Sequence, residues 1–451
     1  MPHTTLPLRT TLHPESPREL QSVVRDCAMR GEAVYPLGGC QSLRYGATAR
    51  RLGSGVNLTG LCRCIDHAAD DLTITVEAGM TFAEVSHILA ERNQRLAWDV
   101  FDPKSATIGG ILATAWSGPR RGRWGGVRES VVGMSVVDGT GRMIHSGGRV
   151  VKNAAGYDLG RLFCGTLGTF GIITEVTLAV RPMPETHAWV LCRHPFPART
   201  EEIVSELIAL QVTPSAMLVT LGEMASPDLT ESEMSDEAVL AVALEGEASE
   251  IGWMLDETLG CLTRLGLSPH ELLDTESEMQ FRRFAAACAG GGGRTGIAVS
   301  GLPGDAVTTA QRFFRRPKPI GNDKGPDDVY EVAGESRTAD GICDSLVFCP
   351  RTGDLRGVTS ERPERVTRWL QQRRQETDSV AGGSPGSMRV TVADASPMKR
   401  ETPENAAIDT GMGWSIASIW GNVSPDMPIF ESLKTSFDPH GILNPGRYIF
   451  R

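Results

Sequence analysis

Glycine-bearing turns are the feature of this sequence that points most directly to chemistry. Three turns carry them, at Gly38–Gly39, at Gly109–Gly110 and within residues 156–171. Glycine is needed where backbone N–H groups converge on an anion, because a side chain would block the approach and successive donors form an anion-binding nest. Any one of these turns alone is typical of ordinary loop structure. Together they predict a site for a cofactor that carries a diphosphate.

Other nucleotide-binding and catalytic patterns fail on their context. LGGCQS, at residues 37–42, lacks the Lys-Ser/Thr of a P-loop, and no GxGxxG opens a strand–helix–strand unit, which argues against Rossmann-type NAD binding. The GxSxG match at 382–386 lies in a Pro/Gly-rich linker rather than on the strand-to-helix turn of a hydrolase. The ten cysteines have no CxxC spacing and the nine histidines form no HExxH, so no metal site is predicted.

Composition indicates a large, acidic globular protein. The chain has 451 residues, of which 40% are hydrophobic, and 45 Lys plus Arg stand against 55 Asp plus Glu. This length favours two or three domains, and the net charge of −10 argues against bulk binding of nucleic acid or anionic membranes. Residues 1–16 lack the apolar segment of a secretory signal, and no apolar run reaches the roughly 18 residues of a membrane span. We expect a soluble cytoplasmic protein with reduced thiols.

The elements that position the first turns can be predicted from capping and periodicity. Ser16, Pro17 and Glu19 predict a helix start with Gly31 as its end. A second helix is expected from Phe82, capped by Thr81 and Glu84. Strands are expected at Ala33–Tyr35, Thr73–Val76, Val131–Val137 and Ile172–Val180. The first strand runs directly into the turn at Gly38.

Beyond residue 185 the pattern changes to that of an antiparallel sheet with helices. Strands are expected at Trp189–Cys192, Met217–Leu221 and Val239–Leu244, and helices at Arg199–Gln211 and Ala248–Leu265. Gly/Pro-rich stretches at Ala289–Gly296, Pro317–Asp328 and Ser379–Ser387 are expected to be loops. The predicted division is a first domain over 1–185, a second over 186–425, and a segment over 426–451 that returns to the first.

The motifs of the first domain, in their order, resemble those of a known family. LGGCQS, PKSATIGGILATAWSG, RGRWGGVRESVVGMSVVDGTG and VKNAAGYDLGRLFCGTLGTFGIITEVTL are similar to the FAD-binding domain of PCMH-type (vanillyl-alcohol oxidase and p-cresol methylhydroxylase) flavoproteins, in particular the E-type subunit of glycolate oxidase. FDPHGILNPGRY matches the family's C-terminal signature. The resemblance covers residues 10–185 and this signature, and is weak between them. It implies an α+β fold, a PCMH-type FAD-binding domain with a smaller α+β cap domain.

The resemblance implies which residues contact FAD. Residues 38–42 would bind the diphosphate through backbone N–H groups, residues 105–110 would run along the diphosphate and flavin, and others would line the same groove. The implied set is Gly38, Gly39, Cys40, Gln41, Ser42, Ser105, Ala106, Thr107, Ile108, Gly109, Gly110, Thr114, Gly118, Asn153, Gly156, Tyr157, Ile172 and Ile173. Ile172 and Ile173 are equally consistent with plain strand core. Cys40 and Gln41 stand where the family often has Gly and Thr. Because no histidine stands in this turn, where some relatives attach flavin covalently, we expect non-covalent FAD.

Arginines after the second glycine turn could face a carboxylate or the reduced flavin, since guanidinium groups suit carboxylates. They are Arg120, Arg121, Arg123 and Arg128. A solvated loop is the simpler interpretation, with Arg128 the best exception because it stands where the chain re-enters a strand. Arg351 and Arg447 are weaker candidates. The substrate-contacting residues predicted are therefore Arg128 and Arg351.

The resemblance implies an FAD-dependent oxidoreductase that acts in a glycolate-oxidase-like complex on a small 2-hydroxy acid. The D-type catalytic subunit of that family carries HxGDGNxH, and this chain has no such motif, so the catalytic base is unknown. We therefore expect an FAD-binding subunit with a D-type flavin subunit and an iron–sulfur subunit as partners. One alternative is an autonomous FAD-dependent oxidase or dehydrogenase of an alcohol or hydroxy acid. Another is a non-catalytic scaffold that has lost FAD.

Overall fold

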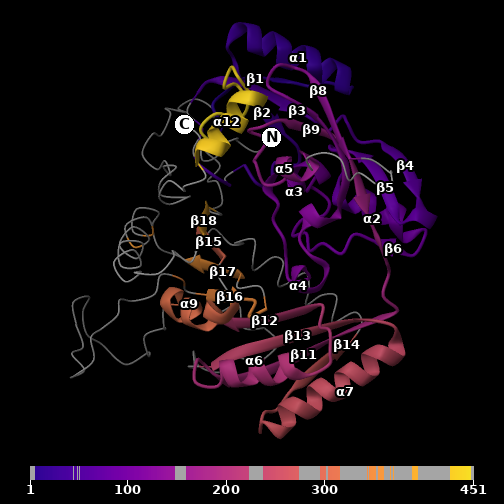
Figure 1. The fold of residues 1–451 in the computed structure, drawn as a ribbon, viewed down its shortest axis with the longest axis vertical. Helices are drawn as coiled ribbons and strands as arrows, with labels where there is room; N and C mark the ends of the chain where they lie inside the picture. Colours follow the sequence, from indigo (N-terminus) through magenta and orange to yellow (C-terminus); the bar gives the residue numbers. More distant parts are fainter. Residues whose placement is uncertain are drawn as a thin grey trace, which may run out of the picture.

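The computed structural model describes residues 6–43, 45–47, 49, 51–147, 159–222, 237–273, 295–300, 303–314, 343, 345–351, 354–359, 366, 369, 389–394 and 427–447. Over these residues the chain has an α+β fold with two large sheets, as predicted (Figure 1). The divisions expected at residues 185 and 425 stay a prediction. The loops expected at 317–328 and 379–387 and the GxSxG match lie outside the described residues.

The first helix confirms the capping signals in the sequence. α1 (Pro17–Arg30) begins after Ser16, whose side chain accepts a hydrogen bond from the Glu19 backbone N–H, and ends at Gly31 in the left-handed conformation. Its buried face packs with Val34 and Val56 of a three-stranded parallel sheet. The strands of this sheet lie in the order β1 (Leu8–Leu12), β3 (Gly53–Asn57) and β2 (Ala33–Leu37).

A five-stranded antiparallel sheet supports the rest of the first part of the chain. Its order is β4 (Cys64–Ala68), β5 (Thr73–Glu77), β9 (Ile172–Ala179), β7 (Val131–Val137) and β8 (Met143–Gly147). The helices beside it are α2 (Phe82–Ala90), α3 (Ile108–Thr114) and α5 (Leu159–Phe163). α2 has the predicted capping box of Thr81 and Glu84. Val76, Val85 and Ile111 lie in one core, which joins sheet and helices.

Short elements link this sheet to the next. β6 (Gln94–Arg95) pairs with β10 (Arg181–Pro182). Between α3 and β7 lie α4 (Arg121–Trp124) and the 3-10 helix η2 (Val127–Ser130), and η1 (Ala69–Asp71) precedes β5. In Figure 1, α4 lies between the five-stranded sheet and the strands of the second part.

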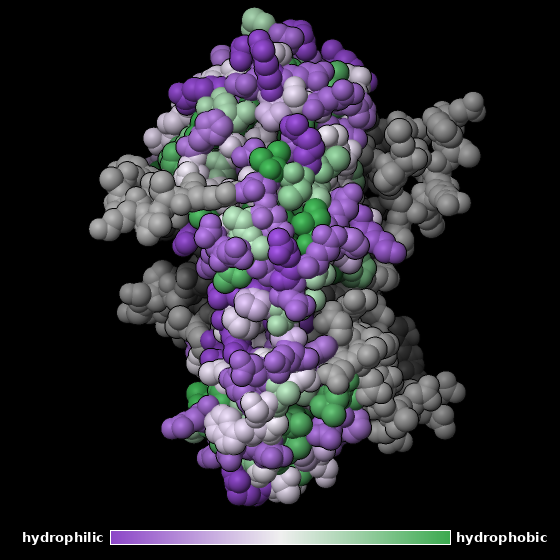
Figure 2. Space-filling view, turned by 90° about the vertical axis from the view of Figure 1, so that its right-hand side faces the viewer, coloured by the Kyte–Doolittle hydropathy of each residue, from purple (hydrophilic) through white to green (hydrophobic). Residues whose placement is uncertain are grey.

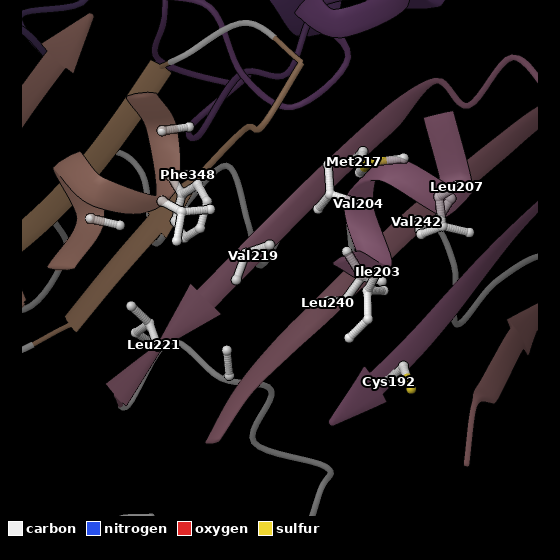
Figure 3. Close-up of a cluster of buried hydrophobic side chains, with 14 of the residues drawn as sticks. Cys192, Ile203, Val204, Leu207, Met217, Val219, Leu221, Leu240, Val242 and Phe348 are labelled. Carbon is white, nitrogen blue, oxygen red and sulfur yellow. The ribbon is translucent and has the colours of Figure 1, made fainter. Parts of the chain in front are cut away.

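An eight-stranded antiparallel sheet forms the second part. Its order is β14 (His270–Leu273), β11 (Thr186–Pro195), β13 (Glu237–Gly246), β12 (Ala216–Leu221), β16 (Ser345–Phe348), β17 (Asp354–Thr359), β15 (Thr295–Ser300) and β18 (Arg389–Asp394). Its helices are α6 (Thr200–Ala209), α7 (Ala248–Arg264) and α9 (Ala306–Phe313), and η4 (Pro303–Asp305) precedes α9. Figure 3 shows Ile203 and Leu207 of α6 directed at Leu240 and Val242 of β13.

The prediction of a loop over Ala289–Gly296 was wrong for its last two residues, because β15 begins at Thr295. Gly296 pairs with both Val358 and Ala393 inside the sheet. Glycine weakens a strand and gives no β signal of its own, so the strand could have been predicted only from the Ile297–Val299 alternation that follows it.

The C-terminal segment lies beside the first elements of the chain. α12 (Met427–Phe437), yellow in Figure 1, is drawn next to β1 and β2. Val34 of β2 donates to Ile442 O at 2.8 Å and accepts from Asn444 N at 2.8 Å. Residues 442–444 thus add a parallel bridge to β2.

Hydrophilic and hydrophobic residues are interspersed on the face of the molecule drawn in Figure 2. Among the helices that the structure describes, none is both long enough and apolar enough to cross a membrane.

Candidate cofactor site

The 38–42 loop, Gly38 to Ser42, follows β2 directly. No described residue accepts a hydrogen bond from the backbone N–H groups of residues 39–42. Cys40 has a φ of 59°, a left-handed conformation that costs a non-glycine residue about 1–2 kcal/mol. Its thiol donates to Gly38 O at 3.3 Å, and burial raises the pKa of that thiol. Neighbouring N–H groups without a protein acceptor are what an anion-binding loop requires.

The second predicted turn packs against this loop. A Cβ at Gly38 would overlap Thr107 Oγ1, and one at Gly39 would overlap the carbonyl oxygen of Ser105. Only glycine permits this approach, because any side chain at residue 39 would enter the backbone of the facing segment. The fold therefore packs Gly38 and Gly39 against residues 105–107. That these two segments form one cofactor site stays a prediction.

The backbone N–H groups of Gly109 and Gly110 donate hydrogen bonds within the protein. At the start of α3, Ile108 N donates to Met80 O at 2.9 Å and Gly109 N to Ala78 O at 2.8 Å. Gly110 N donates to Thr107 Oγ1 at 3.3 Å. A Cβ at Gly109 would lie 2.9 Å from the Ala78 Cβ, so this glycine lets α3 approach the end of β5. The N–H groups open to an anion lie in the 38–42 loop instead.

The remaining predicted contacts are spread around this pair of segments. Thr114 Oγ1 donates to Gly110 O at 3.2 Å and Ile111 O at 3.0 Å at the end of α3. Ile172 and Ile173 begin β9, and both side chains are buried in the core. Their side chains therefore serve packing, while their predicted main-chain contact with a cofactor stays a prediction. Asn153, Gly156 and Tyr157 lie outside the described residues.

A buried ionic network joins the two parts of the chain and was not predicted. Arg120 donates from its backbone N and Nη1 to the two Asp99 oxygens, at 2.8 and 2.7 Å, and from Nε and Nη2 to Glu245 Oε1, at 2.9 and 2.7 Å. Arg95 adds two bonds to Glu245, at 2.8 and 3.2 Å. Gly118 lies against Asp99, with room for no Cβ. The network is thus adjacent to a residue predicted to line the cofactor groove.

The charge state of this network follows from its partners. Burial acts to raise the pKa of Glu245, but Arg120 and Arg95 outweigh it and lower that pKa to about 2. Burial raises the pKa of Asp99, with Arg120 acting in the opposite direction. Glu245 is therefore ionised at neutral pH and held between two guanidinium groups.

The sequence places Glu245 at the end of an apolar strand face, but it does not show which residues neutralise its charge. Residues 239, 241 and 243 of β13 face one side of the sheet, and Glu245 continues the same alternation. A carboxylate at the end of an apolar strand face needs a cationic partner. Its partners lie more than a hundred residues earlier in the chain, and no local pattern identifies them.

The arginines singled out in the sequence lie in different environments. Arg128 is exposed on η2 and Arg120 is buried. Arg123 Nη1 donates to the Glu245 carbonyl at 2.8 Å, and its guanidinium lies 4.6 Å from the Trp124 ring centroid. Arg351 is exposed and donates to Pro214 O at 3.5 Å. Contact of Arg128 or Arg351 with a substrate stays a prediction.

Comparison with known families identifies the first part of the chain. A family model described as an FAD binding domain matches residues 9–147. The fold and this match define the first part as an FAD-binding domain of the PCMH type, with FAD as its cofactor.

The relatives named for an activity are 2-hydroxy acid enzymes. A D-2-hydroxyglutarate dehydrogenase of Xanthomonas citri pv. viticola is 37% identical over 179 residues, 40% of this chain and 38% of the relative. The glycolate oxidase subunit GlcD of Bacillus subtilis is 28% identical over 45% of this chain and 43% of the relative. The glycolate oxidase subunit GlcE of Escherichia coli is 36% identical over 27% of this chain and 35% of the relative. The chain thus matches less than half the length of each.

The fold has a counterpart in a solved structure. Alkyldihydroxyacetonephosphate synthase aligns over 96% of this chain and 76% of its own, with a TM-score of 0.62 and 14% identity. At this identity the likeness extends to the fold alone.

The residues present fit FAD. In the 38–42 loop, the backbone N–H groups of residues 39–42 have no acceptor among the described residues, and the lack of a side chain at Gly39 allows its close approach to Ser105. A loop of this type suits an anionic group and needs no charged side chain.

Proposed function

We propose that the protein is an FAD-dependent oxidoreductase that acts on a small 2-hydroxy acid, as the FAD-binding subunit of a glycolate-oxidase-like complex. Its partners would be a D-type flavin subunit and an iron–sulfur subunit. The observation that carries the proposal is the packing of residues 38–42 against residues 105–107 inside an FAD-binding domain. Relatives named as GlcD, GlcE and a 2-hydroxy acid dehydrogenase support the substrate class.

The proposed mechanism assigns binding and positioning to this chain. Backbone N–H groups of residues 39–42 would hold the FAD diphosphate, and residues 105–107, which lie against Gly38 and Gly39, would support the loop. When bound, FAD supplies a two-electron acceptor for a hydride from the carbon that bears the hydroxyl. Arg120 fixes Asp99 beside Gly118, and through Glu245 it fixes the second sheet against the same segment.

We expect the D-type flavin subunit, and not this chain, to supply the catalytic base. A hydroxy acid needs a base near its hydroxyl, and a positioned base contributes roughly 10²–10⁴-fold to the rate. Asp99 and Glu245, the carboxylates buried in the network, each accept hydrogen bonds from arginine. Both are therefore engaged in ion pairs and are poor candidates for the base. The sequence observation that supports the subunit proposal is the lack of an HxGDGNxH motif.

Steady-state assays of the single chain test this proposal. With glycolate or D-lactate and an artificial acceptor, the isolated chain should turn over very slowly even when loaded with flavin. Co-expression with the D-type and iron–sulfur subunits should restore activity. Vigorous turnover by the single chain, with reduction of its flavin in stopped-flow spectra, would refute the subunit proposal and establish the autonomous enzyme.

The state of the flavin is tested on the same preparation. The protein should purify yellow and release its flavin on acid precipitation, because no histidine stands in the 38–42 loop to anchor it. Flavin that remains with the precipitate would contradict the non-covalent assignment, and a colourless chain that does not take up FAD would support the scaffold.

A further inference from the structure

The described hydrogen bonds within the 38–42 loop come from two side chains, with Cys40 Sγ donating to Gly38 O and Gln41 Nε2 to Gly39 O. Its N–H groups at 39–42 donate to no described residue, and Cys40 holds a left-handed conformation. A loop whose donors are kept for a ligand must be held by its neighbours, because ordering a backbone residue costs roughly 1–2 kcal/mol. Residues 105–107 support one side of the loop. The residues that follow the loop, 45–47, are held by the C-terminal segment.

Arg447 contacts the backbone that leaves the loop. Its Nη2 donates to Tyr45 O at 2.6 Å, and its own carbonyl accepts from Ala47 N at 3.0 Å. Gly46, between these two residues, has a φ of 86° and would place a Cβ onto Arg447 O. Tyr45 N in turn donates to Ser42 O at 3.0 Å. Hydrogen bonds therefore run from Arg447 to the last residue of the 38–42 loop.

The C-terminal segment is itself fixed to the FAD-binding domain. Lys434 Nζ donates to Thr169 O, to Asp438 Oδ2 and to Leu443 O, at 2.6, 2.5 and 3.2 Å. Asn444 Nδ2 donates to Leu167 O at 2.6 Å. Arg447 is 5% exposed, and its Nε has no hydrogen-bond partner in the described part of the chain. Arg447 is thus a buried guanidinium that the C-terminal segment places beside the residues following the loop.

We propose that Arg447 is a positioning residue for FAD: it holds residues 45–47, and through them the 38–42 loop, in the form that binds the diphosphate. The inference rests on the proposed contact of this loop with FAD. It is independent of substrate and partner subunits, so FAD binding tests it without catalysis. The bond from Arg447 to Tyr45 O has a charged donor, so its loss should make the FAD-binding conformation of the loop less stable. The overall fold should persist, because the bonds made by Lys434 and Asn444 remain.

The test is calorimetric titration of the apo-protein with FAD in Arg447→Met and Arg447→Lys variants. Arg447→Met should bind FAD roughly 10- to 100-fold more weakly, the range for loss of a hydrogen bond from a charged group, and Arg447→Lys should recover part of this loss. The matched control is Arg193→Met, which breaks the Arg193–Glu237 pair on the second sheet and should bind FAD like the wild type. Arg447→Met binding within twofold of the wild type would overturn the proposal, as would a loss of affinity that only follows a loss of folded protein.

A measurement on the wild-type protein covers the case in which Arg447→Met does not fold. Hydrogen exchange is followed with and without FAD. We expect FAD to protect residues 38–47 and residues 441–447 together, because the two are joined by hydrogen bonds. Protection of 38–47 with unchanged exchange at 441–447 would overturn the proposal. Absence of any FAD binding by the wild type would instead refute the FAD site itself.

Discussion

Replacing Glu245 by Gln removes the negative charge that Arg95 and Arg120 share. In the folded protein the pKa of Glu245 is about 2, against 4.5 for the ordinary carboxyl. At about 1.4 kcal/mol per pKa unit, this shift corresponds to about 3 kcal/mol of stability at neutral pH. Glu245 is almost fully buried, so solvent does not screen the effect. The cost of breaking a buried ion pair by removing one partner, about 3–5 kcal/mol, is of the same size.

The assay is urea unfolding followed by tryptophan fluorescence, because Trp124 Nε1 lies 3.4 Å from Glu245 Oε2. Glu245→Gln should lower the unfolding free energy of the junction by about 3 kcal/mol at pH 7. Glu237→Gln is the control on the same strand, where a part-exposed pair with Arg193 should contribute under about 1 kcal/mol. If the two variants are equally stable, the reasoning about the network is wrong.

The pH dependence gives a second check on Glu245. Its folded pKa is depressed, so its contribution is complete above pH 4.5 and is lost as the pH falls through 4.5 toward 2. The difference between the wild type and Glu245→Gln should therefore be constant from pH 8 to pH 5.5. It should shrink by roughly 1 kcal/mol at pH 4. A difference that changes between pH 8 and 5.5 would show that another group carries the effect.

Burial lowers the pKa of His194 from 6.5 to about 4. As the pH falls, the histidine is protonated in the unfolded chain before it is protonated in the folded protein, so the free energy of unfolding should decrease by up to about 3 kcal/mol between pH 6.5 and pH 4. His194→Gln should flatten this slope in urea midpoints measured against pH; an unchanged slope would contradict the assignment. Cys40→Val should weaken FAD binding in titration, since a β-branched residue resists the left-handed conformation, whereas Cys40→Gly should not. Gly39→Ala should abolish FAD binding by collision with Ser105 O. Gly31→Ala, whose Cβ would enter open space, should retain FAD and cost about 1 kcal/mol of stability; equal FAD affinities in these two alanine variants would exclude the 38–42 loop.

Local signals in the sequence were sufficient for much of the fold. The Ser16 cap and Gly31 stop define α1, Thr81 with Glu84 caps α2, and the strand expected at Val131–Val137 is β7 with the same ends. The glycine pair at residues 38 and 39 indicated a close approach of the backbone to another group, and in the structure Ser105 and Thr107 lie against it. Helix caps depend on residues close in sequence, and a close approach of two backbones requires glycine, so a single sequence indicates both.

The features that were not predicted depend on long-range contacts. Arg128 was favoured for contact with a substrate, and that stays a prediction. The burial of Arg120 was not predicted, because its partner Glu245 lies on a distant strand. Within the described part of the chain, the N–H groups of residues 39–42 have no acceptor, whereas those of Ile108 and Gly109 donate to Met80 O and Ala78 O. A single sequence shows which groups are charged or polar, but it does not show which of them the fold has already paired.

The bridge between residues 442–444 and β2 sets the order in which the FAD-binding domain can be completed during synthesis. The residues joined by the Arg447–Tyr45 bond are 402 positions apart, so this contact is among the slowest kinds to form. As the chain emerges from the ribosome, the first elements must wait for the entire second sheet before β2 gains its last neighbour. We therefore expect FAD to be acquired after translation has passed residue 447, and a nascent chain halted before α12 to expose the edge of β2 to chaperones.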